Sequence, residues 1–411
     1  MYITWKPCAD AGTCKEGSSM KYTFQGYRRS NGKVGSRNLV AVIPSVICAN
    51  DVGQAICQQV QGTIGYFHHQ GCCQLPIDLK RVTDTLSNLG QSPNVGAALV
   101  VSLGCEGTDA NRLVEEIRAS GKPVEIIRIQ ELGGTARAIQ AGIDAAQRLV
   151  QEISGFQRET VDVSEVVMAI KCGASDTTSG MASNCVIGYV ADKLVDLGAT
   201  VVFGETTEFL GGEHILARRA VGGENGPVGQ KIYEIVKRME ERAKAIGEDM
   251  RGGQPTPGNI AGGLSSIEEK SLGAIVKSGT RPIQGVLEYT ERIDGQKGLW
   301  IKDAPGREPE ILTGMAATGA QFMMFSTGRG APQGFPSMPV IKICGNPNTY
   351  ERMQHDMDLN AGRIITGEAT IEQVGEEAFE EMLRVLSGKM TKNEALGYFG
   401  SMDIFCLGPV I

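Results

Sequence analysis

The strongest constraint on the fold is a series of short, continuous apolar runs that alternate with helical stretches. One run, NLVAVIPSV at residues 38–46, precedes a helical stretch at residues 49–60. Another, VGAALVVSL at residues 95–103, precedes a helix predicted at residues 109–121, which begins at Asp109 and ends at a glycine. Strands that are apolar on both faces are typical of parallel sheets covered by helices on both sides. The pattern therefore predicts an α/β fold with a doubly wound parallel sheet.

The same alternation restarts in the middle of the chain. EVVMAIKC at residues 165–172 and ATVVFGET at residues 199–206 are predicted strands of a second set. We therefore predict two successive Rossmann-like domains, with the site at the strand carboxyl ends between them. The predicted division is an N-terminal extension at residues 1–24, a first α/β domain at residues 25–157 and a second α/β domain at residues 158–411.

Composition excludes several classes of partner. The net charge is −7 and no Lys/Arg-rich run occurs, which argues against nucleic acid or an anionic membrane as the main partner. No run approaches the roughly 20 apolar residues of a membrane span, and the start, MYITWKPCAD, lacks the features of a signal peptide. We therefore expect a cytoplasmic protein. Its 11 cysteines are then predicted to be thiols, ligands or core residues rather than disulfides.

Residues 65–74, GYFHHQGCCQ, place two of the four histidines of the chain near adjacent cysteines. His68 and Cys72 follow a strand predicted at residues 62–67, and other cysteines also end predicted strands. The ligand-type side chains at such ends are Cys48, His68, Cys72, Cys105 and Cys172. Open α/β sheets bind ligands at the carboxyl ends of their strands, whereas a single free cysteine more often packs as a small core residue. We therefore predict a ligand pocket from the set, and a core role for Cys57.

Two further loops carry groups suited to an acid substrate. STGRG at residues 326–330 offers Arg329 to a carboxylate, or is a surface turn. CGASDTTSG at residues 172–180 offers backbone amides to an anion, or contains a helix N-cap at Ser179. No GxGxxG follows the first strand and no GxxxxGK(S/T) occurs, which disfavours a nicotinamide enzyme and a P-loop ATPase.

Eight motifs occur in a fixed order from about residue 25 to the C-terminus. They are GYRRSNGKVGSRN at 26–38, HHQGCC, VSLGCE, KCGASDTTSGMASN at 171–184, GETTEFLGGEHILARRA at 204–220, GNIAGGLSSIEEKSLGA at 258–274, FSTGRG and MDLNAGRI at 357–364. Together they resemble the altronate/galactarate dehydratase family. The resemblance implies a hydro-lyase that removes water from a sugar acid, an aldonate such as altronate or an aldarate such as galactarate, to give a 2-keto-3-deoxy acid. A sister branch eliminates sulfite from sulfolactate.

The resemblance also implies roles for individual residues. It implies a divalent metal, Fe²⁺ or Mn²⁺, held by Cys48, His68, Cys72, Cys105 and Cys172. The family's Glu-His pair falls on Glu213 and His214, and its arginine on Arg329; together with His68 we expect these residues to be catalytic. We also expect the substrate to be bound by Ser175, Asp176, Asn184, Asn259 and Arg329. The family cysteines also permit an iron–sulfur cluster as the alternative cofactor.

A few positions depart from the family pattern. Cys73 and Ala174 stand where glycine is usual, and Cys185 stands where proline is common. The retention of Cys72 and Cys105 favours the dehydratase branch over the sulfite-eliminating branch.

The family's small N-terminal domain is missing from this sequence, so we expect a separate small subunit to supply it. We also expect a homo-oligomer that acts on a small-molecule sugar acid in carbohydrate catabolism. Two alternatives stay open, a sulfolactate-type sulfo-lyase subunit and a non-catalytic subunit that binds sugar acids. A thiol redox role for Cys72 and Cys73 is disfavoured, because adjacent cysteines form a strained disulfide.

Overall fold

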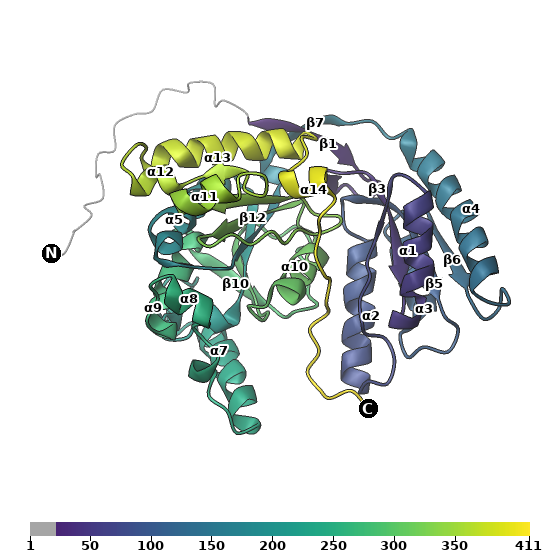
Figure 1. The fold of residues 1–411 in the computed structure, drawn as a ribbon, viewed down its shortest axis with the longest axis horizontal. Coiled ribbons are helices and arrows are strands. Elements are labelled where there is room, and N and C mark those ends of the chain that lie inside the picture. The colour runs from purple at the N-terminus through teal and green to yellow at the C-terminus, as the bar shows by residue number, and fades with distance from the viewer. Residues whose placement is uncertain (1–21) are drawn as a thin grey trace.

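Two parallel sheets with helices packed against them make up most of the molecule, as the sequence predicts (Figure 1). The computed structural model describes residues 22–411, so the predicted extension at residues 1–24 lies outside this range apart from its end. Thr23 and Phe24 already belong to a strand, β1 (Thr23–Arg28). Across the described residues, no helix is long and apolar enough to cross a membrane.

The first sheet has four parallel strands in the order β4-β3-β5-β6. Their bounds are Thr63–Gly65 for β4, Leu39–Pro44 for β3, Val95–Ser102 for β5 and Val124–Arg128 for β6. The helices are α1 (Asn50–Gln59), α2 (Pro76–Gly90), α3 (Ala110–Ala119) and α4 (Thr135–Ser154). Val40 and Val42 pack with α1 and α4, whereas Ala41 and Ile43 pack with α2 and α3. Helices on both faces explain the continuous apolar run of β3.

The second sheet has seven parallel strands in the order β10-β11-β9-β8-β12-β13-β14. Their bounds in this order are Ile283–Leu287, Gly298–Lys302, Thr200–Phe203, Val167–Cys172, Phe322–Thr327, Val340–Cys344 and Leu359–Asn360. The sequence pattern missed β10 and β14. Both lie at an edge of the sheet, where one strand is half exposed and the other is only two residues long.

Ten helices of the described chain follow β8 or connect the later strands. They are α5 (Asn184–Asp196), α6 (Glu213–Arg218), α7 (Pro227–Ala245), α8 (Pro257–Ala261), α9 (Ile267–Ile275), α10 (Glu308–Ala317), α11 (Pro347–Arg352), α12 (Gly362–Ile365), α13 (Ile371–Leu386) and α14 (Lys392–Leu396). A small antiparallel sheet pairs β1 with β2 (Val34–Gly35) and with β7 (Glu159–Asp162). It brings together the two segments that flank the first parallel sheet in the sequence.

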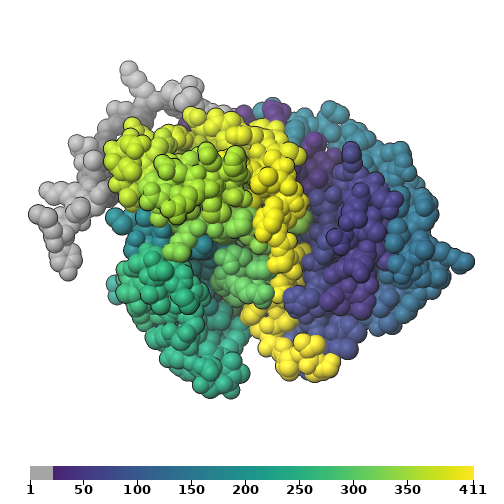
Figure 2. Space-filling view, in the orientation of Figure 1, coloured from purple at the N-terminus to yellow at the C-terminus, as the bar shows by residue number. Residues whose placement is uncertain are grey.

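One hydrophobic cluster joins the two parallel sheets. Helix α2 packs against α10. One buried cluster contains residues of both halves, among them Ile43, Leu86, Ile311 and Phe325. The C-terminal segment runs between the halves (Figures 1 and 2) and adds Met402 and Ile404 to this cluster. Its end is tied to the first half, because the Leu407 N–H donates to the Asp78 carboxylate (2.7 Å).

The order of strands reverses once in each parallel sheet. The reversal lies between β3 and β5 in the first sheet, and between β8 and β12 in the second. A crevice forms beyond the carboxyl ends of the strands at such a point, and open α/β sheets bind ligands there. The loops after β3 and β5 carry Cys48 and Cys105, and those after β8 and β12 carry Ser175 and Arg329. Several predicted site residues therefore lie at the two points where the topology favours a site.

Candidate active site

Three segments meet at the reversal point of the second sheet. The backbone N–H groups of Gly328 and Arg329 donate to the Ala174 carbonyl oxygen (3.3 and 2.9 Å). Asn259 Nδ2 donates to the Ser175 carbonyl oxygen (2.8 Å). The loop after β8 is thus held between the loop after β12 and helix α8.

Asp176 is buried in this loop, and its carboxylate is held in one orientation. Oδ1 accepts hydrogen bonds from Thr178 Oγ1 (2.5 Å) and the Ser179 N–H (3.1 Å), and Oδ2 accepts from Asn346 Nδ2 (3.0 Å). The backbone of Gly328 lies so close that a Cβ there would be 1.9 Å from Oδ1. A fixed carboxylate with further lone pairs is suited to accept a hydrogen bond from a substrate hydroxyl.

A cavity of about 340 Å³ opens between this loop, helix α9 and η3, a π-helical turn at Ser179–Ser183. Its wall includes Ser175, Asp176 and Asn184. The structure therefore brings together three of the predicted substrate-binding residues. Asn259 does not line the cavity and instead supports Ser175 through its carbonyl oxygen.

The predicted catalytic residues Glu213, His214 and Arg329 lie outside this cavity wall. Arg329 is exposed, and its Nε lies near Gly258 at the start of α8. Glu213 and His214 begin α6. Neither residue lines the cavity beside Asp176.

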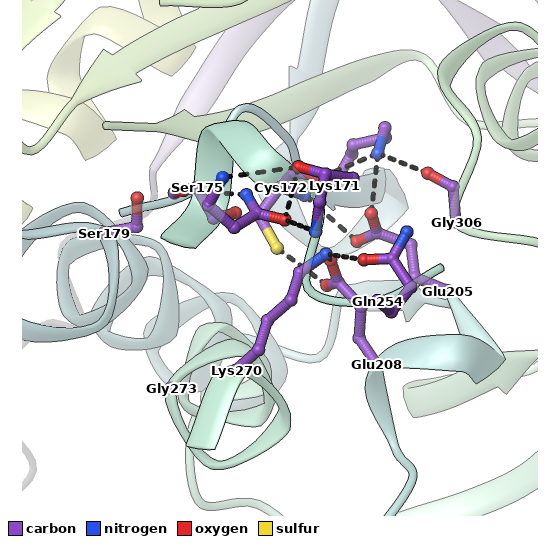
Figure 3. A network of polar contacts seen from close by, with 12 residues as sticks. Lys171, Cys172, Ser175, Ser179, Glu205, Glu208, Gln254, Lys270, Gly273 and Gly306 are labelled. Atoms are coloured by element: carbon purple, nitrogen blue, oxygen red, sulfur yellow. Dashed lines mark hydrogen bonds and ion pairs between the residues drawn. The ribbon is translucent and has the colours of Figure 1, made fainter. Parts of the chain in front are cut away.

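A buried network of charges lies next to the cavity, at the carboxyl ends of β8 and β9 (Figure 3). Lys277 Nζ contacts Cys172 Sγ (3.0 Å), Glu205 Oε2 (2.7 Å) and Glu208 Oε2 (2.9 Å). Lys171 Nζ contacts the other oxygen of Glu205 (2.6 Å). Lys277 and Glu205 have no exposed side-chain surface, so water cannot replace these contacts.

Cys172, Glu205 and Glu208 form a group of described residues whose ligand atoms all lie within 4.8 Å of one another. They are nevertheless a poor metal site, because the Lys277 ammonium group already contacts all three. Burial and the two carboxylates raise the pKa of Cys172, so its sulfur is a neutral thiol. Burial opposes ionisation of Glu208, but the charges of Lys277 and Lys270 outweigh it and hold the pKa of this carboxyl well below its usual value. The lysine charges therefore compensate the buried carboxylates, and the group is an ion network.

Three described residues other than glycine have positive φ angles, namely Cys73 (52°), Ala174 (47°) and Glu205 (71°). Cys73 and Ala174 stand where the resembled family has glycine. Their left-handed backbone explains that preference, because glycine adopts this conformation without a clash of Cβ. All three residues follow strands near the two reversal points, and strained backbone persists most often at functional sites.

The predicted cysteine ligands of the first sheet lie on three loops that are hydrogen-bonded to one another. The loop after β3 contacts the loop after β4 through the Ile47 N–H and the Gln70 carbonyl oxygen (3.0 Å). That loop contacts the loop after β5 through the Gly71 carbonyl oxygen and the Gly107 N–H (2.9 Å). The exposed thiols on these loops belong to Cys48, Cys72, Cys73 and Cys105. Soft thiolate ligands of this kind suit iron–sulfur clusters and soft metal ions.

His68 is not a free ligand beside these thiols. It is 2% exposed, its Nε2 contacts the Pro44 carbonyl oxygen (2.8 Å), and its Nδ1 accepts from the Gln70 N–H (3.1 Å). A carbonyl oxygen only accepts, so Nε2 carries the proton. Burial lowers the pKa of His68 to about 4, which keeps the ring neutral near pH 7. The prediction of one metal centre built from His68, Cys172 and the loop cysteines is therefore corrected. Both ring nitrogens of His68 are hydrogen-bonded to backbone groups, and the Cys172 thiol contacts Lys277 in the ion network.

The sequence interpretation did not predict that Lys171 and Lys277 are buried in an ion network. One signal was present, since Lys171 interrupts the apolar strand β8 and is fully buried. It also missed the contact between the halves, where His69 Nε2 lies 3.1 Å from Asp403 Oδ1 and Arg307 lies 3.4 Å from the other oxygen. These residues are far apart in sequence, and no local pattern pairs them.

Comparison with known proteins identifies the family of the chain. Residues 163–408 match the family described as D-galactarate/Altronate dehydratase, C-terminal, and residues 26–154 match D-galactarate dehydratase/Altronate hydrolase, second domain. The chain belongs to the galactarate/altronate dehydratase family. It is 40% identical over 377 residues to (2R)-sulfolactate sulfo-lyase subunit beta of Chromohalobacter salexigens, which covers 92% of this chain and 95% of that protein.

Two dehydratases are also similar to the chain. Altronate dehydratase of Bacillus subtilis is 33% identical over 404 residues, covering 96% of this chain and 80% of that protein. Galactarate dehydratase (L-threo-forming) of Escherichia coli is 35% identical over 413 residues, covering 95% of this chain and 77% of that protein. The relatives are lyases by name, and this chain is an enzyme of the same lyase family.

Proposed function

We propose that the chain is the catalytic subunit of a hydro-lyase that removes water from a sugar acid, such as altronate or galactarate, to give a 2-keto-3-deoxy acid. The observation that carries the proposal is the chemistry of the cavity wall beside β8. Ser175, Asp176 and Asn184 present hydroxyl, carboxylate and amide groups to one space of about 340 Å³. Such groups recognise a ligand with several hydroxyls, and the space is large enough for a small molecule of this kind.

Elimination of water must overcome the weak acidity of the α-proton and the poor leaving ability of hydroxide. The residues of the cavity contribute by fixing the substrate so that the breaking bonds are aligned. Asp176 is suited to this task, because three donors of its surroundings hold its carboxylate still. Ser175 is held through its backbone by Asn259. The protein therefore offers a rigid template on the loop that follows β8.

The family resemblance implies a metal cofactor, and the residues that would hold one are Cys48, Cys72 and Cys105, whose exposed thiols lie on three loops joined by backbone hydrogen bonds. Thiolates favour iron or an iron–sulfur cluster over Mn²⁺, which prefers oxygen ligands. When bound, such a group supplies Lewis acidity that stabilises the enediolate formed on loss of the α-proton. Cys172 is not included, because its thiol is held by Lys277.

A second candidate function is cleavage of sulfolactate. It is favoured by the relative named (2R)-sulfolactate sulfo-lyase subunit beta, whose length the chain covers almost fully. The same name supports a separate small subunit as a partner of this chain. The cavity favours the sugar acid, because its wall offers several groups that bind hydroxyls, and a sugar acid has several hydroxyls where sulfolactate has one.

One assay separates the two functions. The chain is purified under argon with its iron content measured, mixed with the candidate small subunit, and supplied with altronate, galactarate or sulfolactate. We expect a 2-keto-3-deoxy acid from a sugar acid and no sulfite from sulfolactate. Sulfite release without any keto-deoxy acid would overturn the dehydratase proposal in favour of the sulfo-lyase.

A further inference from the structure

Lys270 on α9 has an unused hydrogen-bond donor at the edge of the cavity beside Asp176. Its Nζ contacts Gln254 Oε1 (2.7 Å) and Glu208 Oε1 (3.4 Å) (Figure 3). An ammonium group has three N–H donors, so one is left after these two acceptors of the described chain. Lys270 lines the cavity, and its side chain is 11% exposed. The remaining N–H is therefore available to a group that enters the cavity.

Asn184 provides a second, independent sign of a ligand. It is 2% exposed and lines the same cavity. Its Nδ2 donates to the Gly273 carbonyl oxygen (2.8 Å), which fixes the direction of the amide. Its Oδ1 is buried and has no hydrogen-bond partner among residues 22–411. A buried acceptor without a donor is rare in folded proteins and calls for an explanation such as a bound hydroxyl.

The free donor and the free acceptor both line the cavity next to α9. Gly273, which holds the Asn184 amide, is three residues after Lys270, and residues at this spacing are neighbours on a helix. The two wall carboxylates are held in place by protein donors. Asp176 accepts four hydrogen bonds from its own surroundings, and Glu269 accepts from the N–H and Oγ of Ser265 (2.7 and 2.5 Å). Lys270 is the cation in the wall whose bonding capacity is incomplete.

A series of buried ion pairs also holds the Lys270 ammonium group in place. Glu208, its charged partner, contacts Lys277 through its other oxygen (2.9 Å), and Lys277 contacts Glu205 (2.7 Å). These groups are buried and their positions are fixed by short contacts, so the Lys270 side chain need not be reordered when a ligand arrives.

We propose that Lys270 binds the carboxylate of a 2-hydroxy acid in this cavity, and that Asn184 Oδ1 accepts a hydrogen bond from a hydroxyl of the same ligand. This inference rests on the proposed sugar-acid function, and it assigns the carboxylate to Lys270 instead of Arg329. It makes Lys270, which lies in the motif at 258–274, a substrate-binding residue that the sequence analysis did not single out. A neutral polyol of the same length lacks the group that Lys270 recognises.

The test compares altronate with its neutral alditol on the assembled, iron-loaded enzyme. The wild type should bind the acid and not the alditol, as measured by calorimetry. Lys270→Met should raise both Kd and KM for altronate about 10- to 100-fold, the range expected for one lost hydrogen bond to a charged group. The value of kcat should change little, because the interaction is present in the ground state as well. Lys270→Arg should recover part of the affinity.

Two control variants make the result specific. Lys237→Met removes an exposed lysine of α7 that pairs with Glu241 (3.6 Å), and it should leave Kd and KM unchanged. Asn184→Leu removes the free acceptor and should raise KM for altronate without changing discrimination against the alditol. If Lys270→Met does not fold, Lys270→Arg and the comparison of acid with alditol on the wild type still decide the question.

The outcomes separate this inference from the function on which it rests. A wild-type enzyme that neither binds nor converts any sugar acid overturns the proposed function and this assignment with it. A wild type that turns over altronate, with a Lys270→Met variant whose Kd stays within twofold, overturns the assignment alone. A variant that loses kcat but keeps its Kd also overturns it, because Lys270 would then act in the chemical step.

Discussion

Replacement of Lys277 by methionine should destabilise the protein strongly. The side chain has no exposed surface, and its ammonium group contacts Glu205 Oε2 (2.7 Å), Glu208 Oε2 (2.9 Å) and Cys172 Sγ (3.0 Å). Removal of one partner from a buried ion pair costs about 3–5 kcal/mol, because a charge is left buried without compensation. Glu205 keeps Lys171 at 2.6 Å and Glu208 keeps Lys270 at 3.4 Å, so we expect the lower end, about 3 kcal/mol.

The measurement is urea unfolding followed by both fluorescence and circular dichroism, with Lys237→Met as the exposed control. The pH dependence provides a second readout. The pKa of Glu208 is depressed in the folded wild type, so its contribution is present above the unfolded pKa and is lost only as pH falls through the lower folded pKa. Without Lys277 the buried carboxyl binds its proton more readily. The difference in unfolding free energy between the wild type and Lys277→Met should therefore become smaller as the pH is lowered from 7 toward 5.

The same variant tests the assignment of this group as an ion network. With Lys277 gone, Cys172, Glu205 and Glu208 are free to bind a divalent cation, and added Co²⁺ should stabilise the variant and give a sulfur-to-cobalt absorption band. The double variant Lys277→Met/Cys172→Ser should lack the part of this band that comes from Cys172. If Lys277→Met is as stable as Lys237→Met, or if the wild type already shows the Cys172-dependent band, the reasoning is refuted.

Three further predictions concern the other parts of the site. The unfolding free energy of the wild type should fall relative to that of His68→Gln by about 2.5 kcal/mol as the pH is lowered from 6.5 to 4, because the unfolded ring takes up a proton in this range whereas the folded ring, with a pKa of about 4, stays largely neutral until its lower end; a difference independent of pH contradicts this. Cys105→Ser should lower the iron content and visible absorbance of protein purified under argon, whereas Cys185→Ser should leave both unchanged. Gly328→Ala should lower kcat/KM at least about tenfold, because its Cβ would lie 1.9 Å from the neighbouring carboxylate, while Gly252→Ala, with no atom within 4 Å of its Cβ, should be neutral.

The buried lysines explain why the sequence analysis, which considered ligand-type residues alone, placed Cys172 in a metal site. Cysteine and glutamate at the carboxyl ends of β8 and β9 have the chemistry of a metal site, and their ligand atoms do lie close together. What decides against a metal is the position of Lys277, which is located in η6 (Val276–Ser278), far along the chain from both strands. A charged side chain from a distant segment therefore decides whether these ligand-type residues can bind a metal.

The sequence by itself determined the elements whose signals are local. Apolar runs identified the buried strands β3, β5 and β8, and the helix α3 begins after Asp109, whose side chain accepts from the Arg112 N–H (2.9 Å). It also determined that thiols follow several strands. Periodicity and capping depend on neighbours within a few residues, so one sequence contains them in full.

Only the tertiary structure decided which of these residues meet. The order of strands brought the loops of Cys48 and Cys105 to one reversal point and placed Asp176 beside Gly328 at the other. His68 Nε2 was committed by the Pro44 carbonyl oxygen at the end of another strand, and Nδ1 by the Gln70 N–H of its own loop. Proximity between loops follows from sheet order and packing, and these are set by contacts across long stretches of chain.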